Sequence, residues 1–208
     1  MSAIIGRKLG MTQVFTEDGT VVPVTVIEAG PCPVTGIRDS ERDGYSAVQL
    51  AFGEVPEGKL TKAEEGHLKK AGAGPMRTLV EFRDADLGGE EEPKVGDTVT
   101  VESFEPGQKV KVSGAGIGKG FAGTIRRHGF RRGPASHGSH NVRAPGSIGA
   151  SADPARVFKG TRMPGRLGGG RVTQRGLEVV EVDAERNLLL IKGSVPGSRN
   201  AVVEVRDD

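Results

Sequence analysis

The sequence predicts a mainly β fold, namely a small β-barrel with one short helix and a long, mostly irregular basic extension inserted between barrel strands. Short runs rich in β-branched residues, separated by Gly and Pro, occupy both ends of the 208-residue chain. Between them lies a stretch rich in Gly and Arg in which no apolar period supports a helix. We therefore predict a globular body from residues 1–110 and 170–208, and an extension from residues 111–169.

The predicted strands come in short runs with turn signals between them. Residues 11–30 read as two strands around the turn residues Glu17, Asp18 and Gly19, and residues 177–193 read as a second hairpin that turns near Asp183–Asn187. The remaining predicted strands are Tyr45–Phe52, Arg77–Arg83, Asp97–Phe104, Gln108–Gly114 and Asn200–Arg206. Neither part of the body offers much core alone, so we expect the strands before and after the extension to form one body.

One helix is predicted near residues 61–71. Thr61 and Glu64 have the spacing of a capping box, and Gly72 is a suitable residue to end the helix. Cys32 is the sole cysteine, which excludes an internal disulfide, fits a reducing compartment and predicts a small buried hydrophobe. No run of about 18 apolar residues occurs, so we expect no membrane partner.

The formal net charge of +2 conceals a strong asymmetry. Residues 109–175 contain fourteen Lys and Arg residues but only one acid, Asp153, which gives this stretch a net charge of +13 and leaves −11 for the rest. The stretch also holds 15 of the 33 glycines, so it cannot easily fold alone. Ten of its fourteen bases are Arg, whose planar guanidinium pairs with phosphate and stacks on bases. This composition predicts a polyanionic partner in preference to a solvated basic face.

The segment GKGFAG, Gly118–Gly123, matches the G-x-G-x-x-G pattern of dinucleotide-binding turns. Such a turn needs a helix after it and an acid about 20 residues further on. We expect no helix, because Gly and Pro interrupt the following residues, and the next acid is the distant Asp153. The glycines are expected to allow sharp turns and a close approach of the backbone to another surface.

Metal binding and catalysis are also disfavoured. His128, His137 and His140 could bind a metal, but their neighbourhood is rich in Arg and has no thiol or nearby carboxylate. The residue types of a catalytic triad are present as Ser136, His137 and Asp153, but no nucleophile motif surrounds Ser136. We therefore predict no metal site and no catalytic residue. Phe121, Phe130 and Phe158 alternate with the basic residues, where they could stack on bases or anchor the extension onto the barrel.

Six ordered segments spread over nearly the whole chain share one resemblance. They are GRKLGMTQVF (Gly6–Phe15), AGPCPVT (Ala29–Thr35), GKGFAGTIRRHGF (Gly118–Phe130), GPASHGSHNVRAPGSIG (Gly133–Gly149), PARVFKGTRMPGRLGGGRVT (Pro154–Thr173) and LLLIKGSVPG (Leu188–Gly197). Together they resemble the bacterial large-subunit ribosomal protein L3 family. The resemblance implies a translation-protein-type β-barrel with a long extension. It also implies a structural constituent of the large ribosomal subunit, located in the cytoplasm in the ribosome, and not an enzyme.

The resemblance further implies direct binding to large-subunit, 23S-type rRNA and an early role in assembly. It implies neighbours such as ribosomal proteins L14 and L19, and no cofactor apart from structural Mg ions held by the rRNA. The predicted rRNA-binding residues are Arg7, Lys8, Lys109, Lys111, Lys119, Phe121, Arg126, Arg127, His128, Phe130, Arg131, Arg132, His137, His140, Arg143, Arg156, Lys159, Arg162, Arg166, Arg171 and Arg175. The predicted tip of the extension, near the peptidyl transferase centre, comprises Ser147, Gly149, Ala150, Ser151, Ala152 and Asp153.

The sequence departs from the family at this tip. Many bacterial members read G-Q-N-Q-T-P where residues 149–154 read GASADP, so Ala150 and Ala152 replace the glutamines. Some members are methylated at the second of these glutamines, and Ala152 has no amide to accept that group. Two other functions fit a barrel with a cationic lid, namely an enzyme acting on a phosphorylated or RNA substrate and a free RNA chaperone that never assembles. An enzyme would need an acid–base pair, and the extension supplies only Asp153.

Overall fold

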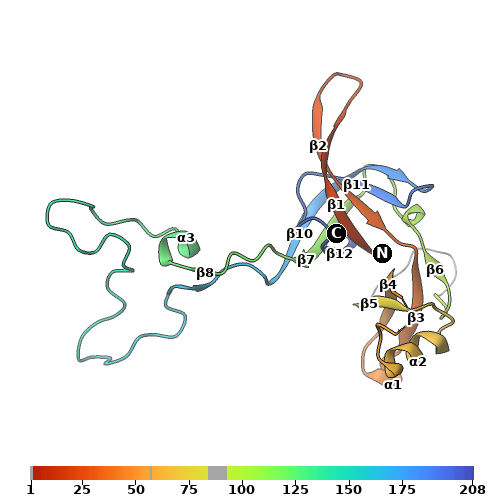
Figure 1. The fold of residues 1–208 in the computed structure, drawn as a ribbon, viewed down its shortest axis with the longest axis horizontal. Coiled ribbons are helices and arrows are strands. Elements are labelled where there is room, and N and C mark those ends of the chain that lie inside the picture. Colours follow the sequence, from red (N-terminus) through yellow and green to blue (C-terminus); the bar gives the residue numbers. More distant parts are fainter. Residues whose placement is uncertain (1, 57, 84–92) are drawn as a thin grey trace. The chain divides into compact units, whose positions relative to one another are not determined.

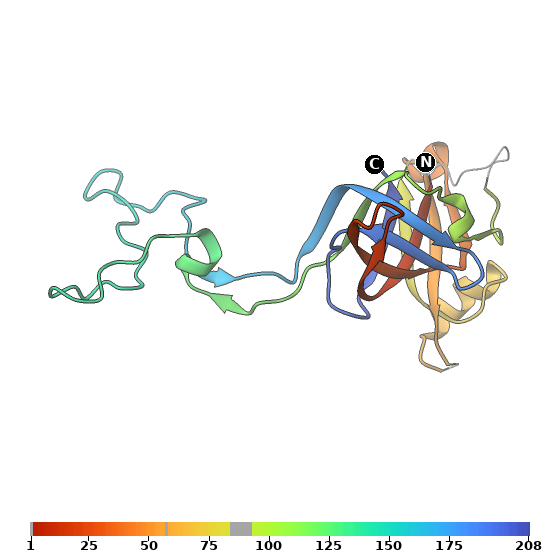
Figure 2. The same ribbon diagram turned by 90° about the horizontal axis from the view of Figure 1, so that it is seen from above.

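The computed structural model describes residues 2–56, 58–83 and 93–208, and it is mainly β, as predicted. The chain divides into two compact units. The first, which we call the body, comprises Met1–Gly116 and Arg171–Asp208, and the second, which we call the basic segment, comprises Ile117–Gly170. Figures 1 and 2 show both units from two directions. No helix in the described residues is long and apolar enough to cross a membrane.

Six strands of the body close into a barrel in the order β1-β12-β7-β10-β11-β2, with every neighbouring pair antiparallel (Figure 1). The strands are β1 (Ala3–Phe15), β2 (Val21–Ala29), β7 (Lys109–Ala115), β10 (Arg171–Asp183), β11 (Leu188–Lys192) and β12 (Val202–Asp207). Strand β12, near the end of the chain, lies between β1 and β7. Strands from both sides of the basic segment are therefore needed to close the barrel.

A second sheet of four strands, in the order β5-β4-β3-β6, packs beside the barrel (Figure 1). Its strands are β3 (Cys32–Arg38), β4 (Ala47–Glu54), β5 (Met76–Arg83) and β6 (Thr98–Val99), and the body also contains helices α1 (Ser40–Asp43) and α2 (Lys62–Lys70) and the 3-10 turn Val101–Ser103. The basic segment contains β8 (Phe121–Ala122), helix α3 (Thr124–His128) and β9 (Gly165–Arg166). These short elements are its sole regular structure.

The barrel and the second sheet share one apolar core. Fully buried side chains of the barrel, such as Ile5 and Leu189, belong to the same cluster as Leu50 and Phe82 of the second sheet. Cys32 is buried in this cluster, where its Sγ donates to the carbonyl oxygen of Ile5 at 3.3 Å, and burial raises its thiol pKa to about 12. The prediction that Cys32 acts as a small buried hydrophobe is thereby confirmed.

Several predicted elements are confirmed and others need correction. The hairpin turns at Glu17–Gly19 and Asp183–Asn187 are present, and α2 begins with the predicted capping box, in which Thr61 Oγ1 accepts from the Glu64 backbone N–H. Gly72 follows the helix in the left-handed conformation that favours glycine. The predicted strand Asp97–Phe104 was wrong beyond Val99, because the chain turns into a 3-10 helix there.

Other elements were missed by the sequence analysis. Strand β3 contains Pro33 and Gly36, which are unusual inside strands, and it therefore gave no alternating pattern. The expectation of a single helix was wrong, since α1 and α3 also form. In particular, a helix does follow Gly123, because Thr124–His128 is free of Gly and Pro for one turn before Gly129 ends it in the left-handed conformation.

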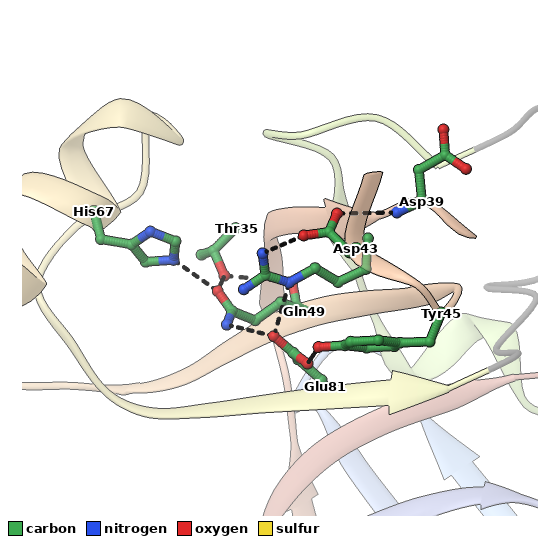
Figure 3. Close-up of polar contacts among 8 residues, drawn as sticks. Thr35, Asp39, Asp43, Tyr45, Gln49, His67 and Glu81 are labelled. Carbon is green, nitrogen blue, oxygen red and sulfur yellow. Dashed lines mark hydrogen bonds and ion pairs between the residues drawn. The ribbon is translucent and has the colours of Figure 1, made fainter. Parts of the chain in front are cut away.

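A polar network covers one side of the second sheet (Figure 3). Glu81 on β5 is its centre: its carboxylate accepts from Tyr45 Oη at 2.7 Å and from Arg38 Nε at 3.1 Å. Gln49 on β4 donates to the same carboxylate, and His67 Nε2 of α2 lies 2.7 Å from Gln49 Oε1. The hydrogen bond from Tyr45 is the main cause that lowers the pKa of Glu81. The network connects β3, β4, β5 and α2, so we interpret it as structural.

Gly6 provides a sharp test of packing between β1 and β2. A Cβ atom added there would lie 2.6 Å from Ile27 Cγ2 and 2.7 Å from the Glu28 carbonyl oxygen, whereas a Cβ at Gly10 would meet nothing within 4 Å. We expect Gly6→Ala to lower the free energy of unfolding by about 1–3 kcal/mol, because the backbone must shift to remove the clash. Gly10→Ala is the control, expected within about 0.5 kcal/mol of the parent. Urea unfolding followed by circular dichroism measures both, and equal stabilities would contradict the packing described.

Glu81 predicts a specific dependence of stability on pH. Its folded-state pKa is lowered, so its contribution to stability is present above the unfolded-state pKa, near 4.3, and is lost as pH falls through the folded value. We expect Glu81→Gln to lower the Tm at pH 7, and the gap to the parent to shrink between about pH 4.5 and pH 3. Glu105→Gln, at an exposed residue with no side-chain partner among the described residues, is the control. A gap that stays constant down to pH 3 would show that ionised Glu81 does not stabilise the sheet.

Candidate nucleic-acid interface

The basic segment carries most of the predicted cations. Ten of the fourteen bases lie in it, against Asp153 as the single acid, so its net charge is +9. They are Lys119, Arg126, Arg127, Arg131, Arg132, Arg143, Arg156, Lys159, Arg162 and Arg166. All are exposed except Arg127, which is half-buried. None forms an ion pair with a carboxylate in residues 2–56, 58–83 or 93–208. Ten positive charges without internal compensation favour binding to a polyanion.

The two ends of the basic segment run antiparallel. Lys119 N donates to the Leu167 carbonyl oxygen at 2.8 Å, Leu167 N donates to Gly120 at 2.9 Å, and Phe121 pairs with Arg166 in the β8–β9 ladder. Just beyond this ladder, α3 is attached to the returning chain by two side chains. Arg127 Nη1 donates to the Met163 carbonyl oxygen at 2.7 Å, and His128 Nε2 lies 3.0 Å from the same atom. Arg127 and His128 therefore organise the basic segment itself.

Residues 129–164 contain no helix or strand, and nearly all of their side chains are exposed. Few hydrogen bonds fix their path, such as the one from Gly133 N to the Val142 carbonyl oxygen at 3.2 Å. Such a segment buries too little apolar area to hold one shape by itself. Its predicted tip, residues 147–153, is exposed throughout, and Ser147 Oγ donates to the Gly149 carbonyl oxygen there.

Glycines in this segment allow the chain to approach itself closely. A Cβ at Gly168 would lie 2.1 Å from the Ile117 carbonyl oxygen, and one at Gly133 would lie 2.3 Å from that of Asn141. The glycines of GKGFAG differ, since Gly118, Gly120 and Gly123 have nothing within 4 Å of an added Cβ. The strand inside this motif has two residues and the helix that follows it has five, which is not the βαβ context of a dinucleotide site.

The aromatic and imidazole groups of the segment are mostly open to solvent. Phe121 is 80% exposed and Phe158 is 59% exposed, with the Arg156 guanidinium 5.6 Å from the Phe158 ring centre. Phe130 is half-buried, 6.0 Å from the His128 ring. Neither Phe121 nor Phe158 is packed into a core, which favours base stacking over anchoring. Among the described residues no cluster of His, Cys, Asp and Glu could hold a metal.

The cations on the barrel strands behave differently from those of the basic segment. Lys111 lies 4.0 Å from Asp208, Arg175 Nε donates to Asp208 at 2.8 Å, and Arg171 pairs with Glu204. The hydrogen bond from Arg175 is the main cause that lowers the pKa of Asp208. Internal carboxylates thus compensate Lys111, Arg171 and Arg175, which makes them weaker candidates for phosphate contacts. Lys109 is exposed on β7, with no side-chain partner among the described residues.

Arg7 and Lys8 lie on β1, away from both of these groups in the sequence. Lys8 Nζ donates to the Val195 carbonyl oxygen at 3.0 Å and to that of Gly197 at 3.1 Å, so it holds the loop between β11 and β12 against β1. Arg7 lines a groove of about 440 Å³ together with Glu54 and Arg77. These two carbonyl partners of Lys8 lie 187 and 189 residues away in the sequence, so no local pattern indicates them.

Comparison with known proteins identifies the family. The family model described as "Ribosomal protein L3" matches residues 74–188. The large ribosomal subunit protein uL3 of a Synechococcus species is 56% identical over 202 residues, covering 97% of this chain and 93% of that protein. The uL3 proteins of Trichlorobacter lovleyi and Herpetosiphon aurantiacus are 55% and 53% identical over 98% and 99% of this chain, respectively, and 95% of each of those proteins. Because this identity extends along nearly its whole length, and the family model matches more than half of it, the chain belongs to the ribosomal protein L3 family.

Proposed function

We propose that the chain binds large-subunit, 23S-type rRNA directly through its basic segment, and that this contact helps to start assembly of the large subunit. The single observation that carries the proposal is the set of ten cations in Ile117–Gly170 without internal ion pairs in the described residues. Neutralising phosphates with such cations releases counterions and provides affinity. Exposed Phe121 and Phe158 offer surfaces on which bases can stack.

Membership of the family settles the coarser role. Ribosomal proteins of the L3 family are structural components of the large subunit that act in translation, in the ribosome in the cytoplasm, and they are not enzymes. Within that role we assign the body to a translation-protein-type barrel and the basic segment to an extension inserted between its strands. Each arm of about 20 residues spans at most roughly 65 Å, which is long enough to enter a large RNA fold.

The proposal assigns residues 147–153 to the end of the extension, toward the peptidyl transferase centre, and the body to contacts with neighbouring proteins, including L14 and L19. The rRNA-binding set then divides in two. Nine of the ten cations of the basic segment would meet RNA directly, together with Phe121, Phe130, His137, His140, Arg7 and Lys109. Arg127 and His128, which bind the Met163 carbonyl oxygen, would chiefly hold the basic segment together. Lys8, Lys111, Arg171 and Arg175, which have internal partners, would chiefly support the body.

The salt dependence of binding tests the electrostatic role. If about eight cations meet phosphates, the logarithm of the association constant for an rRNA fragment should fall with the logarithm of salt at a slope of roughly −6 to −7. Replacing Arg131, Arg132, Arg143 and Arg156 with Gln should make the slope shallower by about 3. The control, Arg171→Gln with Arg175→Gln, removes two paired cations and should change it by less than about 1. A parent slope shallower than about −2 would exclude the basic segment as an electrostatic anchor.

Removal of the segment tests whether it carries RNA binding. Deleting residues 125–164 and joining the ends with a short Gly/Ser linker removes eight bases and Asp153, and takes the formal net charge from +2 to −5. The β8–β9 ladder remains to bring the ends together, so closing the shorter loop should cost the barrel little. We expect β-type circular dichroism and a cooperative melt, with much weaker rRNA binding.

Sucrose gradients at physiological salt provide the cellular readout of the same deletion. The parent should migrate with large subunits in a one-to-one ratio, while cells that depend on the shortened chain should accumulate incomplete subunits. A parent chain that stays at the top of the gradient would favour a free chaperone or an enzyme. A shortened chain that folds and binds rRNA as tightly as the parent would show that RNA binding lies in the body.

A further inference from the structure

The outer half of the β1–β2 hairpin, residues 10–23, presents an apolar face to solvent. Figure 1 shows this hairpin rising from the barrel. Met11, Phe15 and Val21 are 53%, 64% and 49% exposed, and Phe15 pairs directly with Val21 across the two strands. Because side chains alternate along a strand, all three lie on the same face of the ribbon. Exposed apolar groups gathered on one face usually mark an interaction site.

The described chain covers this face only at its inner end, where Thr25, the partner of Met11, is fully buried. Beyond Gly10, β1 pairs only with β2, and β2 pairs with β11 only from Val24 onward. On the opposite face of the ribbon, Val14 and Val22 are half-buried and Val24 is fully buried. A two-stranded ribbon with one covered and one open apolar face is marginally stable in water. A partner that packs against its open face would therefore stabilise the ribbon.

The charge of the hairpin selects the kind of partner. Residues 9–27 contain two acids, Glu17 and Asp18 at the turn, and no Lys or Arg. RNA would bring phosphates to a surface that has acids and no cation to neutralise them. The hairpin of a second copy would add further acids and no base. A basic protein that carries apolar side chains complements both the exposed face and the acidic turn.

We propose that the open face of residues 10–23 docks a basic neighbouring protein, with Met11, Phe15 and Val21 as its apolar contacts and Glu17 and Asp18 as its electrostatic contacts. This inference rests on the proposed function, because a large subunit would supply such a neighbour. It adds to that function a second surface, separate in sequence and opposite in charge to the basic segment. The chain would thus have an RNA-binding surface and a protein-binding surface with different chemistry.

Hydrogen exchange of the full-length chain tests the occupant. Peptides covering residues 11–22 are compared in the free protein, in its binary complex with an rRNA fragment and in purified large subunits. We expect similar exchange in the first two samples and exchange at least about tenfold slower in subunits. Equal protection in the binary complex would identify RNA as the occupant and overturn the proposal. Protection of the free protein that grows with its concentration would identify a second copy and overturn it too, as would fast exchange in subunits.

Two variants provide an independent test by competition with the parent during reconstitution of subunits from rRNA and extracted large-subunit proteins. We expect the triple variant Met11→Thr, Phe15→Thr and Val21→Thr to be incorporated about tenfold less than the parent, since Thr keeps the strand propensity but removes the apolar contacts. The control, Ile37→Thr with Val95→Thr, changes residues that are 43% and 50% exposed elsewhere on the body and should stay within about twofold. Thermal melts check that every variant folds.

Reversing the charge separates the occupants even if the triple variant is unstable. Glu17→Lys with Asp18→Lys should lower incorporation about fivefold or more and leave the affinity for the rRNA fragment within about threefold of the parent. Incorporation that is unchanged or improved would overturn the proposal. Failure of the proposed function gives a different result, because the parent itself would then be absent from large subunits in a sucrose gradient, whatever the hairpin does.

Discussion

The pairing of β7 with β10 is the constraint on which the arrangement of this protein depends. Ala115 is the partner of Arg171 and Gly114 is the partner of Val172, so the chain leaves the barrel and returns to it at adjacent positions of one antiparallel ladder. The loop between these strands can therefore be long without opening the barrel, because a loop's closure entropy grows only slowly with its length. All six strands of the barrel lie in the body, so the basic segment contributes no strand to it.

Different interactions predominate in the two units of the chain. The body holds the shared apolar core, and Glu204 and Asp208 compensate its cations Lys111, Arg171 and Arg175. The basic segment has two buried side chains, Ala122 and Thr124, and ten cations that no described carboxylate compensates. A segment of that kind gains most of its free energy of ordering from its partner. This division explains how one chain with a formal net charge of only +2 can carry a strongly cationic surface.

The acidic residues of the body lie in two kinds of place. Carboxylates of the body take part in local networks, such as Glu81 with Tyr45 and Arg38, or stand at exposed turns, such as Glu17 and Asp18. The net negative charge of the body opposes binding of nucleic acid to its surface, whereas the positive charge of the basic segment favours a polyanion. Its exposed apolar groups are then available for contacts with proteins.

The sequence by itself determined the family, the mainly β class, the two long hairpins, the capped helix α2 and the concentration of charge in one segment. Local patterns indicate these properties, namely alternating apolar and polar residues, turn residues, a capping box with three-residue spacing, and composition. Only the tertiary structure decided that β12 closes the barrel between β1 and β7, that Lys8 holds the loop at Val195, and that Arg171 and Arg175 are paired with acids of the last strand and the chain end. The physical reason is that strand register and ion pairing join residues 33 or 187 positions apart, and such contacts leave no trace in a local pattern.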